Sequence, residues 1–351
     1  MAGIKRHLMS WGTGGPGPAP STGAATVVLE SAGHLAATLG SDLVGPGSVV
    51  FAPGVADHAE DASGAVVVGY EGSLSEAGGE CSLGSDFYLQ IQNYGVSAYM
   101  SVVGPTLVRV ADAMDLDAYR ADAEQAGRSG DFPDFLTNPV IQLADLPALG
   151  ADRTGSGPRH RLYADGDGFL STAPGGTRLG VLGEDTLEAL EARWLPLDDL
   201  LPGIAAADRA GLGRYLAAVA AVRGLRARGL TGVRVSGFGG RFGTAAASVP
   251  PREAADTTGA RLPLLLRSGE ETFVHDPASG RTFTLAPAAA ALAEVLLAAG
   301  SVEAASAHAD RTGLEQVAAS FAETGISLGT AAGAPARARA AHTGDLVTAG
   351  C

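Results

Sequence analysis

The residues of this chain that could carry catalysis are scattered, and their spacing matches no familiar catalytic motif. No two of its histidines have the i, i+4 spacing of a helical metal site, and no G-x-S-x-G nucleophile elbow is present. Lys5 is the single lysine, so no internal lysine could hold a pyridoxal cofactor or serve a phosphate loop. We therefore expect a non-enzymatic protein with no catalytic residues, no metal and no cofactor. The alternative is an enzyme with a dispersed active site within residues 23–250.

Two glycine-containing motifs have partial matches to ligand-binding loops. Asp165-Gly-Asp167-Gly begins like a calcium loop but lacks the third acid and the distal glutamate, which favours a plain hairpin turn. The run 237–243, GFGGRFG, follows a predicted strand as a dinucleotide fingerprint would. Phe242 occupies the position of the third glycine, so a tight bend or a packing surface is the better interpretation.

Composition sets the class of protein and its compartment. With 351 residues, 46% of them hydrophobic, the chain can form two or three domains. Its net charge of −14 argues against a nucleic-acid partner and leaves two interpretations, a solvated acidic surface or an attraction for a basic peptide or partner. Cys81 and Cys351 are too few for a disulfide framework, and no signal peptide or membrane span is visible. We expect a cytoplasmic protein with no membrane partner.

The N-terminal 250 residues read as an α/β region behind a flexible arm. Residues 1–22 are rich in Gly, Pro and Ser, and Trp11 in this arm is either docked on the body or exposed. An α/β domain is predicted over 23–150, with a hairpin of 87–93 and 96–103 and a helix near 115–127. A second α/β segment over 151–250 contains a long helix at 205–228. Whether 23–250 forms one domain or two stays open.

The C-terminal part has a clearer pattern. After a linker at 247–260, predicted strands at 262–267, 271–276 and 281–285 alternate with turns, and three short helices follow. The first helix spans 287–299, the second begins after Ser301, and the third runs from Gly313 to Gly325. Residues 331–351 read as a disordered tail. The predicted fold is a multidomain α+β or α/β protein. Its N-terminal α/β region precedes a winged helix-turn-helix at 259–330, with a three-stranded antiparallel sheet and three helices.

This C-terminal pattern resembles the PqqD-like family. The hairpin D-x-x-S-G-R-x-F-x-L at 276–285 precedes an Ala-rich helix, and the last helix ends in Gly325-Ile326. Domains of this family are recognition elements for ribosomally made, post-translationally modified peptides (RiPPs). The resemblance implies that a precursor leader peptide adds as a strand to the third strand, against the third helix. The implied leader-binding residues are Arg281, Thr282, Phe283, Thr284, Leu285, Leu314, Val317, Ala318 and Phe321.

The whole chain is similar to the recognition proteins of daptide biosynthesis. The similarity includes the opening K-R-H-L-M-S-W-G-T-G at 5–14 and the segment V-S-G-F-G-G-R-F at 235–242. It implies that the chain works beside a dehydrogenase, an aminotransferase and a methyltransferase, to which the chemistry would belong. Docking of one of these enzymes is the role that the similarity implies for the first 250 residues.

The main alternative for the C-terminal part is a DNA-binding transcriptional regulator. The predicted third helix contains no Arg or Lys, and residues 259–330 hold four arginines against eight acids. Such a surface repels phosphates, which favours a peptide as the partner. A plainer alternative for Leu314, Val317 and Phe321 is that they only fill the core.

Overall fold

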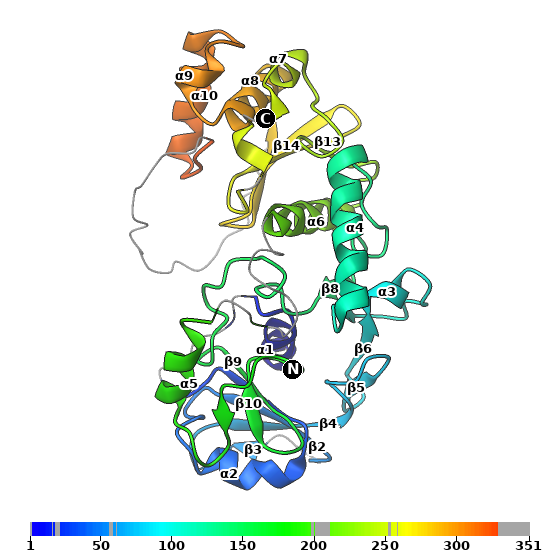
Figure 1. The fold of residues 1–351 in the computed structure, drawn as a ribbon, viewed down its shortest axis with the longest axis vertical. Coiled ribbons are helices and arrows are strands. Elements are labelled where there is room, and N and C mark those ends of the chain that lie inside the picture. The colour runs from blue at the N-terminus through cyan, green and yellow to red at the C-terminus, as the bar shows by residue number, and fades with distance from the viewer. Residues whose placement is uncertain are drawn as a thin grey trace.

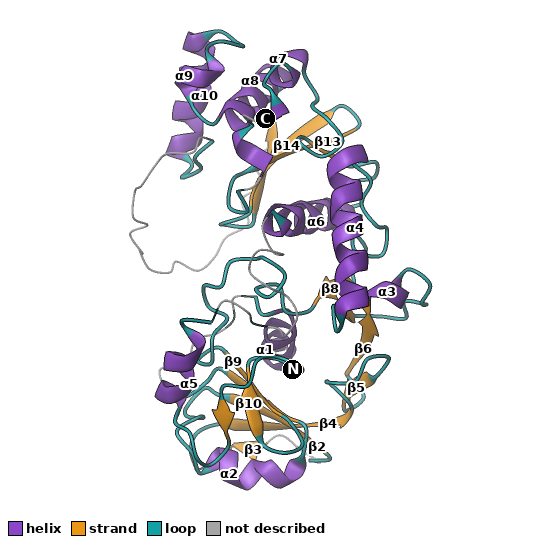
Figure 2. Cartoon of the chain, viewed as in Figure 1, coloured by secondary structure: helices purple, strands orange, loops and turns teal. Residues whose placement is uncertain are grey.

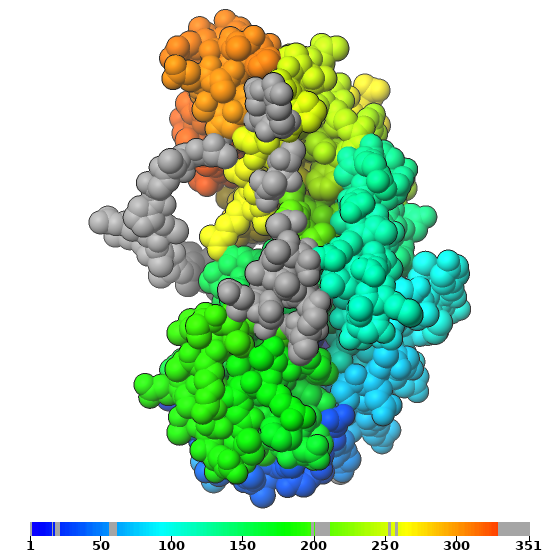
Figure 3. Space-filling model, in the orientation of Figure 1, coloured from blue at the N-terminus to red at the C-terminus, as the bar shows by residue number. Residues whose placement is uncertain are grey.

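The chain folds into a large α/β body with a smaller C-terminal sheet and helices stacked on one end (Figures 1 and 3). The computed structural model describes residues 2–15, 17, 22–55, 59–60, 62–197, 200, 211–251, 254–257 and 259–328. The predicted mixed α/β class is confirmed. Among the described residues, no helix is long and apolar enough to cross a bilayer. The predicted tail at 331–351 and the helix residues 205–210 lie outside the described part.

An eleven-stranded sheet forms the body. Its order is β11-β10-β9-β1-β2-β4-β5-β6-β7-β8, with β3 beside β4. The strands are β1 (Thr26–Leu29), β2 (Val49–Pro53), β3 (Ala59–Glu60), β4 (Val66–Gly72), β5 (Glu80–Leu83), β6 (Phe87–Asn93), β7 (Thr106–Arg109), β8 (Ile141–Leu143), β9 (Arg161–Ala164), β10 (Phe169–Ser171) and β11 (Gly180–Val181). The strands β9, β1, β2, β4, β6, β7 and β8 run in one direction, and β5 interrupts the series. Because β9 pairs with β1, strands from both sides of residue 150 belong to one sheet.

Both faces of this sheet are covered. Alternate residues of β1 enter different cores, with Val27 on one face and Val28 on the other. Leu8 and Trp11 of helix α1 (Ala2–Thr13) cover the face of Val28. Helices α2 (Leu35–Leu39), preceded by a 3-10 turn at Ala32–His34, and α5 (Leu187–Trp194) cover the opposite face (Figure 2). The run of buried apolar residues in β1 and β2 is typical of a parallel sheet between two helical layers.

Helix α1 overturns the prediction of a flexible arm for residues 2–13. Trp11 is only 2% exposed, and its indole Nε1 donates to the carbonyl of Leu162 at 2.9 Å. Gly12 also lies so close to Leu107 that a β-carbon there would meet its Cδ2 at 2.9 Å. The helix forms because its apolar side chains are buried in the body, despite weak helix formers such as Gly3 and Gly12. The docking alternative for Trp11 is thus the correct one.

Replacing Trp11 by phenylalanine is expected to lower the free energy of unfolding by about 1–2 kcal/mol, because the ring shrinks and a buried hydrogen bond is lost. Trp194 is the matched control. It is also buried, but its Nε1 has no acceptor among the described residues. Trp194→Phe should therefore cost less in urea unfolding followed by circular dichroism. Equal costs for the two variants would show that the bond from Trp11 contributes nothing.

The predicted hairpin of 87–93 and 96–103 is wrong. A short helix, α3 (Tyr94–Ser97), follows β6, and the chain then returns to form β7 parallel to β6. Asp115 of helix α4 (Ala113–Ser129) accepts from the backbone N–H of Gly95 at 2.8 Å and so holds the turn of α3. The helix expected near 115–127 is confirmed as α4, which Asp112 caps at its start and Gly130 ends in a left-handed conformation.

Helix α6 (Leu212–Ala227) joins the body to the C-terminal sheet, and Figure 1 shows it lying between α4 and the strands of that sheet. On one side, Tyr215 and Val219 pack with α4 in the core of the body. On another side, Val222 and Leu225 pack under the C-terminal sheet. One helix therefore belongs to two hydrophobic cores.

The C-terminal sheet has four antiparallel strands where three were predicted. Its order is β12 (Arg234–Val235), β13 (Leu264–Ser268), β14 (Glu271–Asp276) and β15 (Arg281–Leu285). The added strand, β12, lies in the segment assigned to the preceding domain, and it pairs with β13 across a long stretch of sequence. Helices α8 (Pro287–Ala299), α9 (Val302–Ala305) and α10 (Arg311–Glu323) follow. Helix α10 begins before Gly313 because Asp310 caps it by accepting from the N–H of Gly313.

The predicted linker at 247–260 is in part a packed segment. It follows helix α7 (Thr244–Ala247) and contains a 3-10 turn at Ala255–Thr257. Asp256 in that turn is buried, and its carboxylate accepts hydrogen bonds from Nη1 and Nη2 of Arg241 at 2.6 and 2.8 Å. A bidentate ion pair of this kind fixes the segment to the loop after β12.

Candidate functional site

Strand β15 forms an edge of the C-terminal sheet, as the peptide-binding hypothesis requires. It pairs with β14 in the register Asp276–Arg281, Val274–Phe283 and Thr272–Leu285, and no described strand pairs with its other side. The free edge is therefore a row of backbone donors and acceptors that another chain could use.

The side chains of β15 divide between the two faces of the sheet. Phe283 and Leu285 pack in the core shared with α8 and α10, while Thr284 is exposed. On the face of Thr284, the hydroxyl of Thr282 lies 2.9 Å from Nδ1 of His275. Burial lowers the pKa of His275, so the ring is mainly neutral at pH 7 and can share this hydrogen bond. Arg281 lies with its guanidinium 4.7 Å from the centre of the Phe283 ring.

The four predicted residues of α10 have two different environments. Leu314 and Phe321 are buried, so the plainer reading of them as core residues is correct. Val317 and Ala318 are half-buried on the same core. Ala318 borders a hollow of about 410 Å³, whose other lining comes from α8, α9 and residues 322–328. The hollow has no lining from β15, so Ala318 and the strand edge do not face one shared cavity.

A buried carboxylate connects this C-terminal unit to the loop after β12. Glu294 of α8 is 2% exposed. It accepts from the hydroxyl of Ser236 at 2.6 Å and from the backbone N–H groups of Phe242 and Gly243 at 2.6 and 2.9 Å. Three donors satisfy the charge, which is the condition for burying a carboxylate at tolerable cost.

The glycine run 237–243 is a packing element. Gly239 has φ +69°, and a β-carbon there would lie 2.3 Å from the backbone of Ser129 at the end of α4. Its N–H also donates to the carbonyl of Gly127 at 3.0 Å. The interpretation as a packing surface is thus confirmed, and the glycine pattern results from close backbone approach.

The Asp165 motif forms the hairpin turn expected from the sequence. The side chain of Asp165 accepts from the N–H groups of Asp167 and Phe169, between the antiparallel strands β9 and β10. Within the part of the chain that the structure describes, no group of three or more His, Cys, Asp or Glu side chains is placed to hold a metal.

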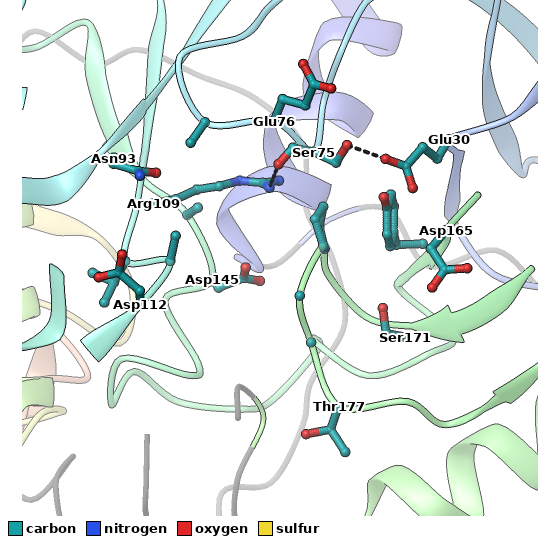
Figure 4. A pocket seen from close by; sticks show the side chains of 18 of the residues that line it. Glu30, Ser75, Glu76, Asn93, Arg109, Asp112, Asp145, Asp165, Ser171 and Thr177 are labelled. Carbon is teal, nitrogen blue, oxygen red and sulfur yellow. Dashed lines mark hydrogen bonds between the residues drawn. The ribbon is translucent and has the colours of Figure 1, made fainter. Parts of the chain in front are cut away.

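A cavity of about 940 Å³ lies at one edge of the large sheet (Figure 4). Its lining includes residues at or just after the carboxyl ends of the parallel strands. Glu30 follows β1, Asn93 ends β6, Arg109 ends β7, Asp145 follows β8 and Asp165 follows β9. In open α/β sheets, ligands bind in the crevice outside the carboxyl ends of the strands. The cavity thus has the usual position of a ligand site.

Two charged side chains of this cavity, Asp145 and Arg109, differ in how well their hydrogen-bonding groups are paired. Asp145 has φ 50°, a left-handed conformation, and its carboxylate pairs with the buried Arg161 at 2.5 Å. Arg109 is 7% exposed and donates through Nη1 to the carbonyl of Ser75 at 3.0 Å. Its Nε is buried without an acceptor among the described residues. Burial lowers the pKa of Arg109, and the more distant charge of Asp145 only partly opposes this effect.

Sequence reasoning missed this cavity. The available signal was a polar residue directly after each predicted strand, as Glu30 follows the apolar run 26–29 and Asp165 follows 161–164. The signal was hidden because residues 96–103, after Asn93, were predicted to form the second strand of a hairpin with 87–93, whereas α3 and then β7 follow β6. An antiparallel partner for 87–93 gives no reason to expect the next strand, β7, to run parallel to β6 and to end at the same edge of the sheet as β1.

Comparison of the chain with protein families, curated proteins and solved structures gave no match.

Proposed function

We propose that this chain is a recognition protein of RiPP biosynthesis, of the daptide type, that binds the leader of a precursor peptide and presents it to modifying enzymes. The observation that carries the proposal is the open edge of β15 beside half-buried apolar side chains. An extended peptide that pairs with such an edge gains main-chain hydrogen bonds, and neighbouring pockets select its side chains. Three strands, β13 to β15, followed by α8, α9 and α10, also have the order of a PqqD-like winged helix-turn-helix.

The leader is proposed to lie along Arg281–Leu285, with its apolar side chains toward Val317, whereas Ala318 borders a separate hollow that a leader residue beyond the paired strand could enter. Phe283 and Leu285 already pack into the core between β14 and the helices, so they support the edge from one face. Leu314 and Phe321 hold α10 in place from below. The net charge of −14 favours a leader with basic residues.

The partners in this proposal are a dehydrogenase, an aminotransferase and a methyltransferase, and the chain itself serves as a non-catalytic adaptor in the cytoplasm. The large α/β body would provide the docking surface for one of these enzymes. The resemblance to daptide recognition proteins supports this assignment.

A DNA-binding function is disfavoured by the charge of α10. Arg311 is the one cation of this helix, and its Nε donates to Glu315 at 2.8 Å. The exposed positions that follow include Glu315, Gln316, Ser320 and Glu323. A recognition helix that offers mainly carboxylates to the major groove is repelled by phosphates.

The test is fluorescence anisotropy with the full-length protein and a labelled leader, with duplex DNA as a second probe. We expect saturable leader binding, no binding of duplex DNA at physiological salt, and no change in the mass of the precursor without partner enzymes. Sub-micromolar, sequence-specific DNA binding without leader binding would contradict the proposal. A mass change produced by the protein and common cofactors would contradict the adaptor role.

A further inference from the structure

We propose that the cavity at the carboxyl edge of the large sheet binds a small zwitterion of the α-amino-acid type, with the ligand carboxylate on Arg109 and the ligand ammonium near Glu30. This inference does not depend on leader binding at β15. It rests on a buried cation that has no ion-pair partner among the described residues, on the arrangement of Ser75 between two opposite charges, and on the total charge of the lining.

The contrast between two neighbouring arginines identifies the anion site. Arg161, the first residue of β9, and Arg109, the last residue of β7, are both buried. Arg161 pairs with Asp145, whereas no carboxylate of a described residue lies within 4 Å of Arg109. A guanidinium in a low-dielectric site is costly unless an anion and further acceptors satisfy it. Because Arg109 lines the cavity, a ligand carboxylate is the group that would complete it.

Ser75 places a negative group on the other side of this cation. Its carbonyl accepts from Arg109 at 3.0 Å, and its hydroxyl donates to Oε1 of Glu30 at 2.7 Å (Figure 4). The guanidinium and the carboxylate therefore lie on opposite sides of one residue. This arrangement is complementary to a molecule that carries a carboxylate and an ammonium close together.

Glu30 is held in its charged form. Burial would raise its pKa, but hydrogen bonds from Ser75, Tyr163 and the N–H of Gly166 together outweigh that effect and lower it. A carboxylate that is ionised at neutral pH attracts an ammonium group. Asn93 adds a buried Oδ1 that has no donor among the described residues, and a polar ligand could supply one.

The net negative charge of the cavity lining disfavours ligands with several negative charges. Five carboxylates, on Glu30, Glu76, Asp112, Asp145 and Asp165, face two guanidinium groups, on Arg109 and Arg178. Asp145 is already paired with Arg161, so the other six groups carry a formal charge of −2, which disfavours a nucleotide or a phosphorylated sugar. The carboxylate of a zwitterion can pair with Arg109, and the ammonium of the same molecule leaves the ligand with no net charge. The volume of about 940 Å³ exceeds the needs of one amino acid, so a free amino acid and a short peptide both fit this chemistry.

The experiment is isothermal titration calorimetry of the full-length protein with a panel of amino acids and dipeptides, together with acetate and ATP. We expect at least one zwitterion to bind saturably, acetate to bind more weakly and ATP not to bind. If only amino acids bind, the source is the free metabolite; if only dipeptides bind, it is a peptide end. Either result supports the site. No zwitterion binding in the millimolar range would overturn it.

Variants identify the group that binds. Arg109→Met should weaken zwitterion binding by at least about tenfold, because a charge-assisted hydrogen bond is lost. Arg109→Lys, which keeps the charge, should restore part of it. Arg223→Met is the control, since Arg223 is half-buried and also donates to a backbone carbonyl, that of Ile141 at 3.0 Å, but does not line this cavity. If Arg109→Met does not fold, Glu30→Gln tests the other half of the site.

The outcome separates this inference from the proposed function. Arg109→Met is expected to bind the leader with wild-type affinity, because Arg109 lies in the body and not on β15. Unchanged zwitterion affinity in both Arg109→Met and Glu30→Gln would overturn the assignment of this cavity, whatever the result for the leader.

Discussion

Replacing Glu294 by alanine is expected to lower the free energy of unfolding by about 3–5 kcal/mol, because a buried acceptor is removed from three donors at once. The backbone N–H groups of Phe242 and Gly243 and the hydroxyl of Ser236 lose their partner. Each donor left without an acceptor costs roughly 1–3 kcal/mol, and relaxation of the loop recovers part of the sum. Urea unfolding followed by circular dichroism measures the loss as a lower midpoint.

Two further variants show whether the loss comes from this network. Glu294→Gln keeps the shape and one acceptor oxygen, so it should fall between the wild type and Glu294→Ala. Glu303→Ala removes an exposed carboxylate from α9 and should change stability by less than about 0.5 kcal/mol. A Glu294→Ala protein as stable as Glu303→Ala would show that water replaces the carboxylate without loss.

Proline at position 284 is expected to weaken leader binding by roughly 5- to 150-fold while the fold is retained. Pairs along an antiparallel ladder alternate between hydrogen-bonded and non-hydrogen-bonded, and side chains are closer in the second kind. The hydrogen bond between His275 and Thr282 is typical of such a close pair. The pair Phe273–Thr284 lies two residues along and is of the same kind, so the N–H of Thr284 points away from β14. Proline removes this donor from the free edge and leaves the bonds to β14 intact.

Thr284→Val is the control for this prediction. It changes the side chain but keeps the N–H group, so it should bind the leader like the wild type. Anisotropy of a labelled leader gives the affinities, and circular dichroism shows whether each variant is folded. A folded Thr284→Pro protein with wild-type affinity would mean that the leader docks elsewhere.

The elements predicted best are those with local signals. Pro277 to Gly280 marks the turn of the β14–β15 hairpin, and Pro287 with Gly300 marks the two ends of α8. These residues act through their own backbone geometry, so their effect is visible in the sequence without knowledge of the rest of the fold.

The features that were missed depend on contacts between distant residues. Helix α1 contains Gly3 and Gly12 and is stabilised by burial of Trp11 against Leu162, a partner 151 residues away. Strand β12 was recognised as a strand, but its pairing with β13 depends on how the intervening residues fold back. The cavity likewise combines Glu30, Arg109 and Asp165, which meet only when the order and direction of the strands are known. Periodicity and composition contain no information on such pairings.

Helix α6 has a consequence for how the C-terminal recognition unit can be used. Its residues fill the underside of the sheet at Leu264, Leu266 and Phe273, and Arg214 donates to the carbonyl of Pro263 at 2.9 Å just before β13. Excision of residues 259–328 would expose that apolar underside to water. We therefore expect that residues 259–328 do not fold as an independent domain. A fusion of this unit to another protein requires α6 and its Arg214 as well.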